Sequence, residues 1–218
     1  GEGSFGSIYR ILNKNTKETF ACKTLSKKRI NDKKLIQKEI SILQSLDHPN
    51  IVNLFEVFED QRNIYLIMEE CKGGSLEDRI LSSAGKKLTE RKVAEIMESI
   101  FQAINHIHAQ GFCHGDLKHE NILFARKDDD NSLKLIDFGL GKNTKDPSDK
   151  NNFVGSPHYV APEILNGECN IKSDIWSAGV IMYSLLSGQM PFNGKDREEI
   201  YKEIQSGKVF YPPRCNVF

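Results

Sequence analysis

Short hydrophobic runs alternate with polar turns over the first third of the chain. This alternation predicts four strands: Ser7–Leu12, Thr19–Leu25, Val52–Phe58 and Ile64–Met68. Lys33–Leu46 carries apolar residues at helical spacing, and it predicts a helix that ends at Asp47-His48-Pro49. Gly73-Gly74 then interrupts the pattern, so we expect the strand-rich part of the chain to end there.

Helices dominate the rest of the sequence. Thr89 is the predicted start of an amphipathic helix, and Ser173–Ser187 predicts a helix that is apolar on nearly all sides and belongs inside a core. Ile122–Phe124 and Leu133–Ile136 flank a charged turn and predict a hairpin. The polar stretch Gly141–Asn152 predicts a structureless loop, whose length is typical of functional or mobile loops.

The order of these segments predicts an α+β protein with two lobes. We expect an N-terminal lobe at 1–68, a hinge at 69–74 and a C-terminal lobe at 75–218, and the 218 residues suffice for a sizeable core. Lys and Arg number 30, as do Asp and Glu, so the zero net charge argues against a nucleic-acid partner bound by bulk positive charge. No apolar run approaches the roughly 18 residues of a membrane span. The five scattered cysteines suggest neither a zinc site nor a disulfide framework, and they favour a reducing, cytoplasmic location.

The chain opens on a glycine-rich segment, Gly1-Glu2-Gly3-Ser4-Phe5-Gly6. Glycines allow a backbone to turn tightly and to approach phosphates closely. A strand rather than a helix is predicted after Gly6, which favours a flap between two strands over a dinucleotide-binding turn. On this motif alone, an ordinary glycine hairpin is an equally good interpretation.

Lys23 lies in a predicted apolar strand, where a lone ammonium would be costly to bury. Glu39, on the predicted Lys33–Leu46 helix, is the natural partner, and the pair could present the ammonium to nucleotide phosphates. The alternative is that both side chains face solvent.

A second polar cluster follows the long helix. Asp116, Lys118 and Asn121 fall within six positions, between a predicted helix and a predicted strand. Such a loop can place a carboxylate base, an ammonium and an amide metal ligand around one substrate hydroxyl. Asp137 follows the next apolar strand, and its carboxylate suits Mg²⁺, which prefers hard oxygen ligands.

The order and spacing of these motifs together resemble those of the eukaryotic-type protein kinases over essentially the whole chain. The matching set is the glycine-rich segment, Ala21-x-Lys23, Glu39, His114-x-Asp116-x-x-x-x-Asn121, Asp137-Phe138-Gly139 and Ala161-Pro162-Glu163. The resemblance implies a small antiparallel β lobe with one regulatory helix and a larger, mainly helical lobe. It also implies that the chain is a fragment of a longer protein.

The resemblance implies a role for each matching residue, with ATP and Mg²⁺ as cofactors. Lys23 would hold the α- and β-phosphates and pair with Glu39, Asp116 would accept the proton of the substrate hydroxyl, and Lys118 would steady the γ-phosphate. Asn121 and Asp137 would bind Mg²⁺.

The nucleotide would lie under the glycine-rich segment, whose implied contacts are Gly1, Gly3, Ser4, Phe5 and Gly6. Adenine would be enclosed by Ile8, Ala21 and Leu123, with backbone hydrogen bonds from Glu69 and Cys71 behind a Met68 gatekeeper. Ser156 would hydrogen-bond Asp116 and Lys118, and this segment resembles serine/threonine rather than tyrosine kinases.

A finer resemblance links Glu70–Ile80 and Ile171–Gly194 to the calcium-dependent protein kinases of the calmodulin-dependent kinase group. It implies protein substrates with Ser or Thr acceptors and a calcium-responsive segment outside these residues. Gly115 stands where many kinases have an arginine, and Asn152 stands at the usual phosphoacceptor position, so we expect no control by phosphorylation of this loop.

Two alternatives accompany this hypothesis. A pseudokinase that acts as a nucleotide-binding scaffold is supported by Gly115 and by the incomplete chain. A small-molecule kinase is disfavoured because Ala161-Pro162-Glu163 and the loop before it form a peptide platform. Ser75 and Ser184 stand where arginine-directed kinases often have glutamates, while Glu120 remains, so a basic peptide substrate is plausible but open.

Overall fold

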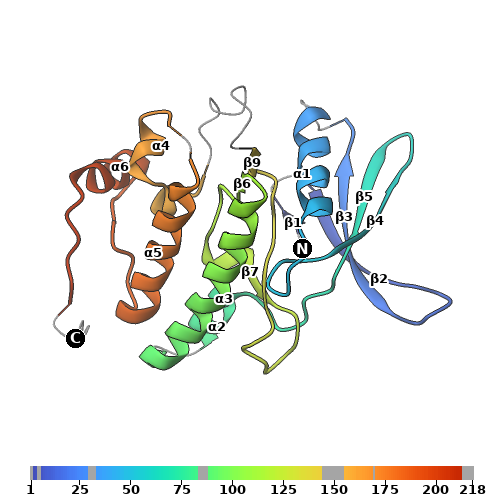
Figure 1. The fold of residues 1–218 in the computed structure, drawn as a ribbon, viewed down its shortest axis with the longest axis horizontal. Helices are drawn as coiled ribbons and strands as arrows, with labels where there is room; N and C mark the ends of the chain where they lie inside the picture. Colours follow the sequence, from blue (N-terminus) through green and yellow to red (C-terminus); the bar gives the residue numbers. More distant parts are fainter. Residues whose placement is uncertain are drawn as a thin grey trace.

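The computed structural model describes residues 2–3, 6–28, 33–82, 88–143, 155–168 and 170–212, and gives the backbone alone at 2–3 and 33–35. A sheet with one helix lies at one end of the molecule, and the larger helices lie at the other (Figure 1). The elements are β1 (Glu2–Gly3), β2 (Gly6–Leu12), β3 (Thr19–Ser26), α1 (Lys33–Ser45), β4 (Leu54–Glu59), β5 (Asn63–Met68), α2 (Leu76–Ser82), α3 (Glu90–Ala109), β6 (Phe112–Cys113), the 3-10 turn η1 (His119–Asn121), β7 (Ile122–Phe124), β8 (Leu133–Leu135), β9 (Lys142–Asn143), the 3-10 turn η3 (Pro157–Tyr159), α4 (Pro162–Leu165), α5 (Lys172–Ser187) and α6 (Arg197–Ser206).

The N-terminal sheet is antiparallel throughout, with strand order β1-β2-β3-β5-β4. In its register Ile8 lies opposite Lys23, and Ala21 lies opposite Met68. Ala21 and Lys23 are two positions apart on β3 and therefore share one face of the sheet. A small core of Leu25, Ile36 and Leu66, contributed by β3, α1 and β5, joins the helix to the sheet.

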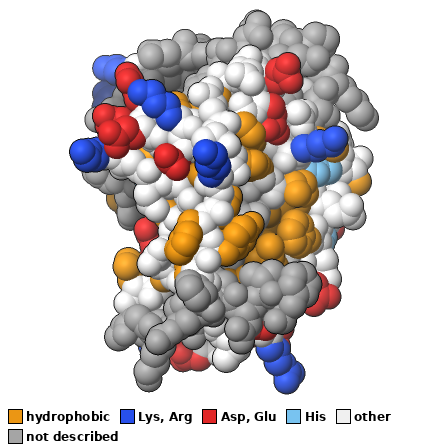
Figure 2. Space-filling model, turned by 90° about the vertical axis from the view of Figure 1, so that its left-hand side faces the viewer, with side chains coloured by type: hydrophobic (Ala, Val, Ile, Leu, Met, Phe, Trp, Pro, Cys, Tyr) orange, Lys and Arg blue, Asp and Glu red, His pale blue; other side chains and the backbone are white. Residues whose placement is uncertain are grey.

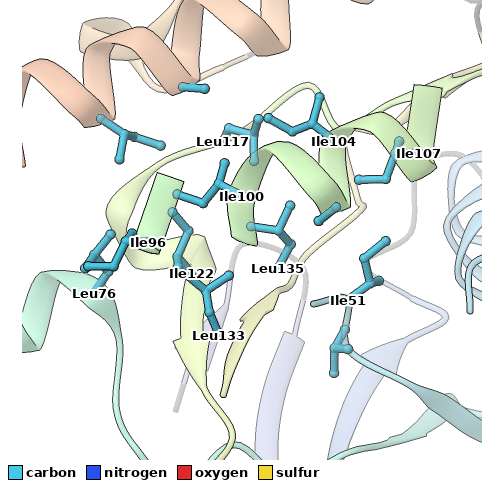
Figure 3. Close-up of a cluster of buried hydrophobic side chains, with 14 of the residues drawn as sticks. Ile51, Leu76, Ile96, Ile100, Ile104, Ile107, Leu117, Ile122, Leu133 and Leu135 are labelled. Atoms are coloured by element: carbon cyan, nitrogen blue, oxygen red, sulfur yellow. The ribbon is translucent and has the colours of Figure 1, made fainter. Parts of the chain in front are cut away.

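The helical part is built on α3 and α5, with the β7–β8 hairpin packed against them. Thr89 caps α3, accepting a hydrogen bond from the Lys92 backbone N–H, as its sequence position predicted. The apolar face of α3 lies in the largest core cluster (Figure 3), whose labelled members are Ile51, Leu76, Ile96, Ile100, Ile104, Ile107, Leu117, Ile122, Leu133 and Leu135. This core fixes the position of the loop between β6 and β7, which carries the predicted catalytic residues.

The fold confirms the predicted bilobal α+β architecture and corrects two local expectations. The segment at 141–152 is not structureless at its start, since Lys142 and Asn143 form β9 and pair with β6. Residues 144–152 lie outside the described residues. Val52 does not belong to a strand, because β4 begins only at Leu54.

The expectation that α5 is buried on all sides is wrong. Ile175 and Met182 are 45% and 41% exposed, although Ala178 and Ile181 are buried. Figure 2 views the end of the molecule that carries α5 and α6 and shows hydrophobic side chains gathered on it. An apolar helix can therefore retain a partly exposed face. None of the described helices combines the length and apolar character that a membrane span requires.

Candidate active site

A cleft of about 590 Å³ lies between the sheet and the helical part of the molecule. It gathers side chains from β2, β3, α1, the β5–α2 connection, η1, β7 and the residues after β8. Its lining includes these residues singled out in the sequence: Ile8, Ala21, Lys23, Glu39, Met68, Glu69, Cys71, Lys118, Asn121, Leu123 and Asp137. Gly3 and Gly6 lie on β1 and β2, whereas Gly1, Ser4 and Phe5 lie outside the described residues.

Lys23 makes two ion pairs inside the cleft. Its Nζ atom lies 2.7 Å from Glu39 Oε1 and 3.0 Å from Asp137 Oδ1, and Lys23 and Glu39 are nearly fully buried. Burial alone would lower the pKa of Lys23, but the two carboxylates raise it above its ordinary value. Burial would likewise raise the pKa of Asp137, but the Lys23 ammonium lowers it. The predicted contact between Lys23 and Glu39 is thus confirmed, and both pKa shifts favour the charged forms of Lys23 and Asp137.

Lys118 and Asn121, in the loop between β6 and β7, line the opposite wall of the cleft, whereas Asp116 and Ser156 line a small pocket next to it. Lys118 Nζ lies 2.8 Å from Asp116 Oδ2 and donates to Ser156 Oγ at 2.9 Å. The Ser156 hydroxyl and backbone N–H donate to Asp116 Oδ1 at 3.1 and 3.2 Å. These contacts, expected from the resemblance, orient the carboxylate of Asp116 by hydrogen bonds to both of its oxygens.

Asn121 and Asp137 supply the oxygen atoms suited to a divalent cation. The Asn121 amide N–H₂ group donates to the Asp116 carbonyl at 2.8 Å and to Asp116 Oδ2 at 3.1 Å, which directs its side-chain oxygen elsewhere as an acceptor. Among the described residues, no group of three or more acidic, histidine or cysteine side chains could form a metal cage. This donor set fits Mg²⁺, which is usually held by one or two protein ligands together with substrate phosphates.

Asp174, on α5, fixes the backbone that leads into Asp116, and the sequence reasoning missed this role. Its buried carboxylate accepts from the backbone N–H of His114 at 2.9 Å and of Gly115 at 3.0 Å, and lies 2.8 Å from His108 Nε2. Gly115 has φ +79°, and an added Cβ would lie 2.6 Å from the Leu140 carbonyl oxygen. An acidic residue within an otherwise apolar helix was the signal that could have identified Asp174.

The hinge side of the cleft is held by two further ion pairs. Glu69 Oε2 lies 2.8 Å from Lys134 Nζ on β8, and Glu70 Oε1 lies 2.7 Å from Arg10 Nε on β2. The Glu69 backbone N–H donates to the Asn53 carbonyl. We therefore expect the Glu69 carbonyl, not its N–H, to form the hydrogen bond with a nucleotide. Burial, with Glu69 nearby, raises the pKa of Cys71 to about 12, which keeps its thiol protonated.

Several cleft residues escaped the sequence reasoning. Val52 and Ile136 also line the cleft and extend its apolar floor beside Leu123. The hydrophobic pattern placed Val52 and Ile136 inside the predicted strands, whereas they lie just outside β4 and β8. The pattern also does not show which side of a connecting segment faces a ligand.

The sequence profile of the protein kinase domain family matches residues 1–212, so the chain belongs to that family. Calcium-dependent protein kinase 5 of Plasmodium berghei (strain Anka) is 41% identical over 97% of this chain, which covers 37% of that protein. Calcium-dependent protein kinase 25 of Arabidopsis thaliana is 39% identical over 96% of this chain, and the match covers 41% of that protein. The predicted resemblance to both groups is confirmed, and the chain spans well under half the length of these relatives.

Proposed function

We propose that the protein transfers the γ-phosphate of ATP to serine or threonine hydroxyls of other proteins. The observation that carries this proposal is the arrangement around Asp116, whose carboxylate is oriented by Lys118, Asn121 and Ser156. The adjoining cleft holds Lys23 between Glu39 and Asp137. Phosphoryl transfer needs positioning and charge stabilisation more than covalent participation of the protein, and this arrangement supplies both.

Each residue of the site has its own proposed role. Lys23, fixed by Glu39, would bind the phosphates next to the sugar, while Lys118 would bind the transferred phosphate. Asp116 would orient the acceptor hydroxyl and accept its proton. Asn121 and Asp137 would hold Mg²⁺, which would supply positive charge to the phosphate oxygens. Ile8, Ala21 and Leu123 offer apolar contacts for adenine.

Selectivity for Ser and Thr is supported by the contact between Lys118 and Ser156. Lys118 contacts both Asp116 and Ser156, and we expect the acceptor hydroxyl to lie beside these three side chains. The pseudokinase alternative draws no support from the cleft, since each residue needed for transfer is present and connected to its expected neighbours.

We also propose that a calcium-responsive segment, outside these residues, controls the enzyme inside the cell. The support is the likeness to proteins named calcium-dependent protein kinases. Gly115 offers no cation to a phosphorylated loop, and Asn152, which lies outside the described residues, offers no hydroxyl. The element under control would be α1, because its displacement separates Glu39 from Lys23.

The test is a phosphotransfer assay on the full-length protein. It is incubated with Mg²⁺, labelled ATP and a basic peptide containing one serine, with and without Ca²⁺, and the Asp116→Asn variant serves as the control. We expect label on the serine only with the wild-type protein and only with Ca²⁺. Absence of label under all conditions would refute the enzymatic proposal. Activity that survives calcium chelation but not phosphatase treatment would refute the regulatory one.

A further inference from the structure

A buried histidine lies inside the loop at 116–121 but does not line the cleft. His119 directly follows Lys118 and is 7% exposed. Its Nδ1 atom lies 2.8 Å from the Tyr159 hydroxyl in η3, and its Nε2 atom lies 2.8 Å from Ser184 Oγ on α5. A buried imidazole that contacts a hydroxyl at each nitrogen joins three separate parts of the chain.

The surrounding groups determine which nitrogen carries the proton. The Ser184 hydroxyl donates to the Ile181 carbonyl at 2.7 Å, so Ser184 Oγ accepts from His119. His119 Nε2 therefore bears the hydrogen. Nδ1 is then the acceptor for the Tyr159 O–H group. The donors and acceptors around the ring thus assign one hydrogen-bond direction to each nitrogen.

The chain of hydrogen bonds continues from Tyr159 to the residue that contacts Asp116. The Tyr159 backbone N–H donates to the Ser156 carbonyl at 3.0 Å, and the Tyr159 carbonyl accepts from Ser177 Oγ on α5 at 2.8 Å. Ser156 in turn contacts Asp116 and Lys118. The loop at 116–121 and the segment at 156–159 are thus joined twice, once by Lys118 and Ser156 and once by His119 and Tyr159.

We infer that His119 is a positioning residue for phosphoryl transfer, which holds the catalytic loop and the peptide-side segment in register through Tyr159 and Ser184. The inference rests on the proposed kinase function. A displacement of about 1 Å between reacting groups can cost about a hundredfold in rate. Lys23, Glu39 and Asp137 lie on other elements, whereas Lys118 and Asn121 share the loop of His119. Loss of His119 should therefore lower the transfer rate by much more than the affinity for the nucleotide.

The test compares full-length His119→Ala, Tyr159→Phe and the double variant with wild type. We expect His119→Ala to lower kcat for a serine peptide by about 10- to 100-fold, and to lower the Mg·ATP affinity measured by calorimetry by much less. Tyr159→Phe removes one hydroxyl and keeps the aromatic ring, so it replaces the alanine variant as the test if that variant folds poorly. The double variant should lose no more than His119→Ala, because the Tyr159 hydroxyl acts through His119. Tyr65→Phe, which removes a hydroxyl from the far end of β5, is the matched control and should retain full activity.

Three results would overturn the inference: a kcat of His119→Ala within threefold of wild type, fully additive losses in the double variant, or a parallel loss of ATP affinity. An inactive wild-type protein would refute the kinase proposal instead. The hydrogen-bond arrangement is then tested by nitrogen-15 NMR of His119. We expect the Nε2–H tautomer, and the Nδ1–H tautomer would refute this arrangement.

Discussion

Removal of either charge from the Lys23–Glu39 pair should destabilise the protein and abolish most of its activity. The two atoms are 2.7 Å apart, and the side chains are 8% and 4% exposed. Breaking a buried pair typically costs about 3–5 kcal/mol, because the remaining charge loses its partner. Glu39→Gln should lie near the lower end, about 3 kcal/mol, since Asp137 still neutralises Lys23 at 3.0 Å. Lys23→Met leaves two carboxylates without their ammonium and should cost about 4 kcal/mol.

The double variant Lys23→Met/Glu39→Gln provides the sharper test. Without either charge, neither Met nor the neutral amide requires an ionic partner, so the loss should be smaller than the sum of the single losses by about 1–3 kcal/mol. Urea unfolding, followed by the fluorescence of Trp176, the one tryptophan of the chain, measures each free energy. Glu59→Gln removes one partner of an exposed pair with Lys27 and is the matched control, with little change expected.

Activity is measured on the same variants. Since Lys23 depends on Glu39 for its position, each single variant should lose about a hundredfold or more in phosphotransfer to a peptide. Additive free energies, or single variants as stable as wild type, would show that the pair is not coupled. Activity within tenfold of wild type would show that Lys23 does not position the phosphates.

Three further outcomes follow from the same contacts. Asp116→Asn should keep Mg·ATP binding and lose about 10²–10⁴ in transfer rate, and near-normal labelling of a peptide would contradict its role. Asp137→Ala should abolish Mg²⁺-dependent ATP binding in calorimetry, so unchanged affinity would exclude it as a metal ligand. Burial lowers the pKa of His119 from about 6.5 to about 4, so the neutral ring stabilises the fold fully above pH 6.5. This contribution to the free energy of unfolding is lost as the pH falls towards 4, and it amounts to about 3 kcal/mol. In His119→Gln, the urea concentration at the unfolding midpoint should vary less with pH between 4 and 6.5 than in wild type. An unchanged pH dependence would contradict this assignment.

Local sequence signals determined most of the elements and the identity of the candidate site. The period of the apolar positions predicted α1, α3 and the main strands within a few residues, and Thr89 predicted the start of α3, because capping and amphipathicity depend on near neighbours. The spacing of Lys23, Asp116 and Asp137 indicated a kinase. The glycine-rich segment and most of the loop after Gly141 remain sequence predictions, since they fall largely outside the described residues.

The tertiary structure alone decided the contacts between segments far apart in the chain. Asp174 lies 60 residues from His114, and Ser184 lies 65 residues from His119, so no periodic pattern could connect them. The sequence likewise could not show that Ile175 on α5 stays exposed. The hydrophobicity of a side chain shows that burial is favourable, and it does not show whether another segment covers it. Which side of a helix is covered, and which histidine is held between two hydroxyls, depends on how complete elements pack together.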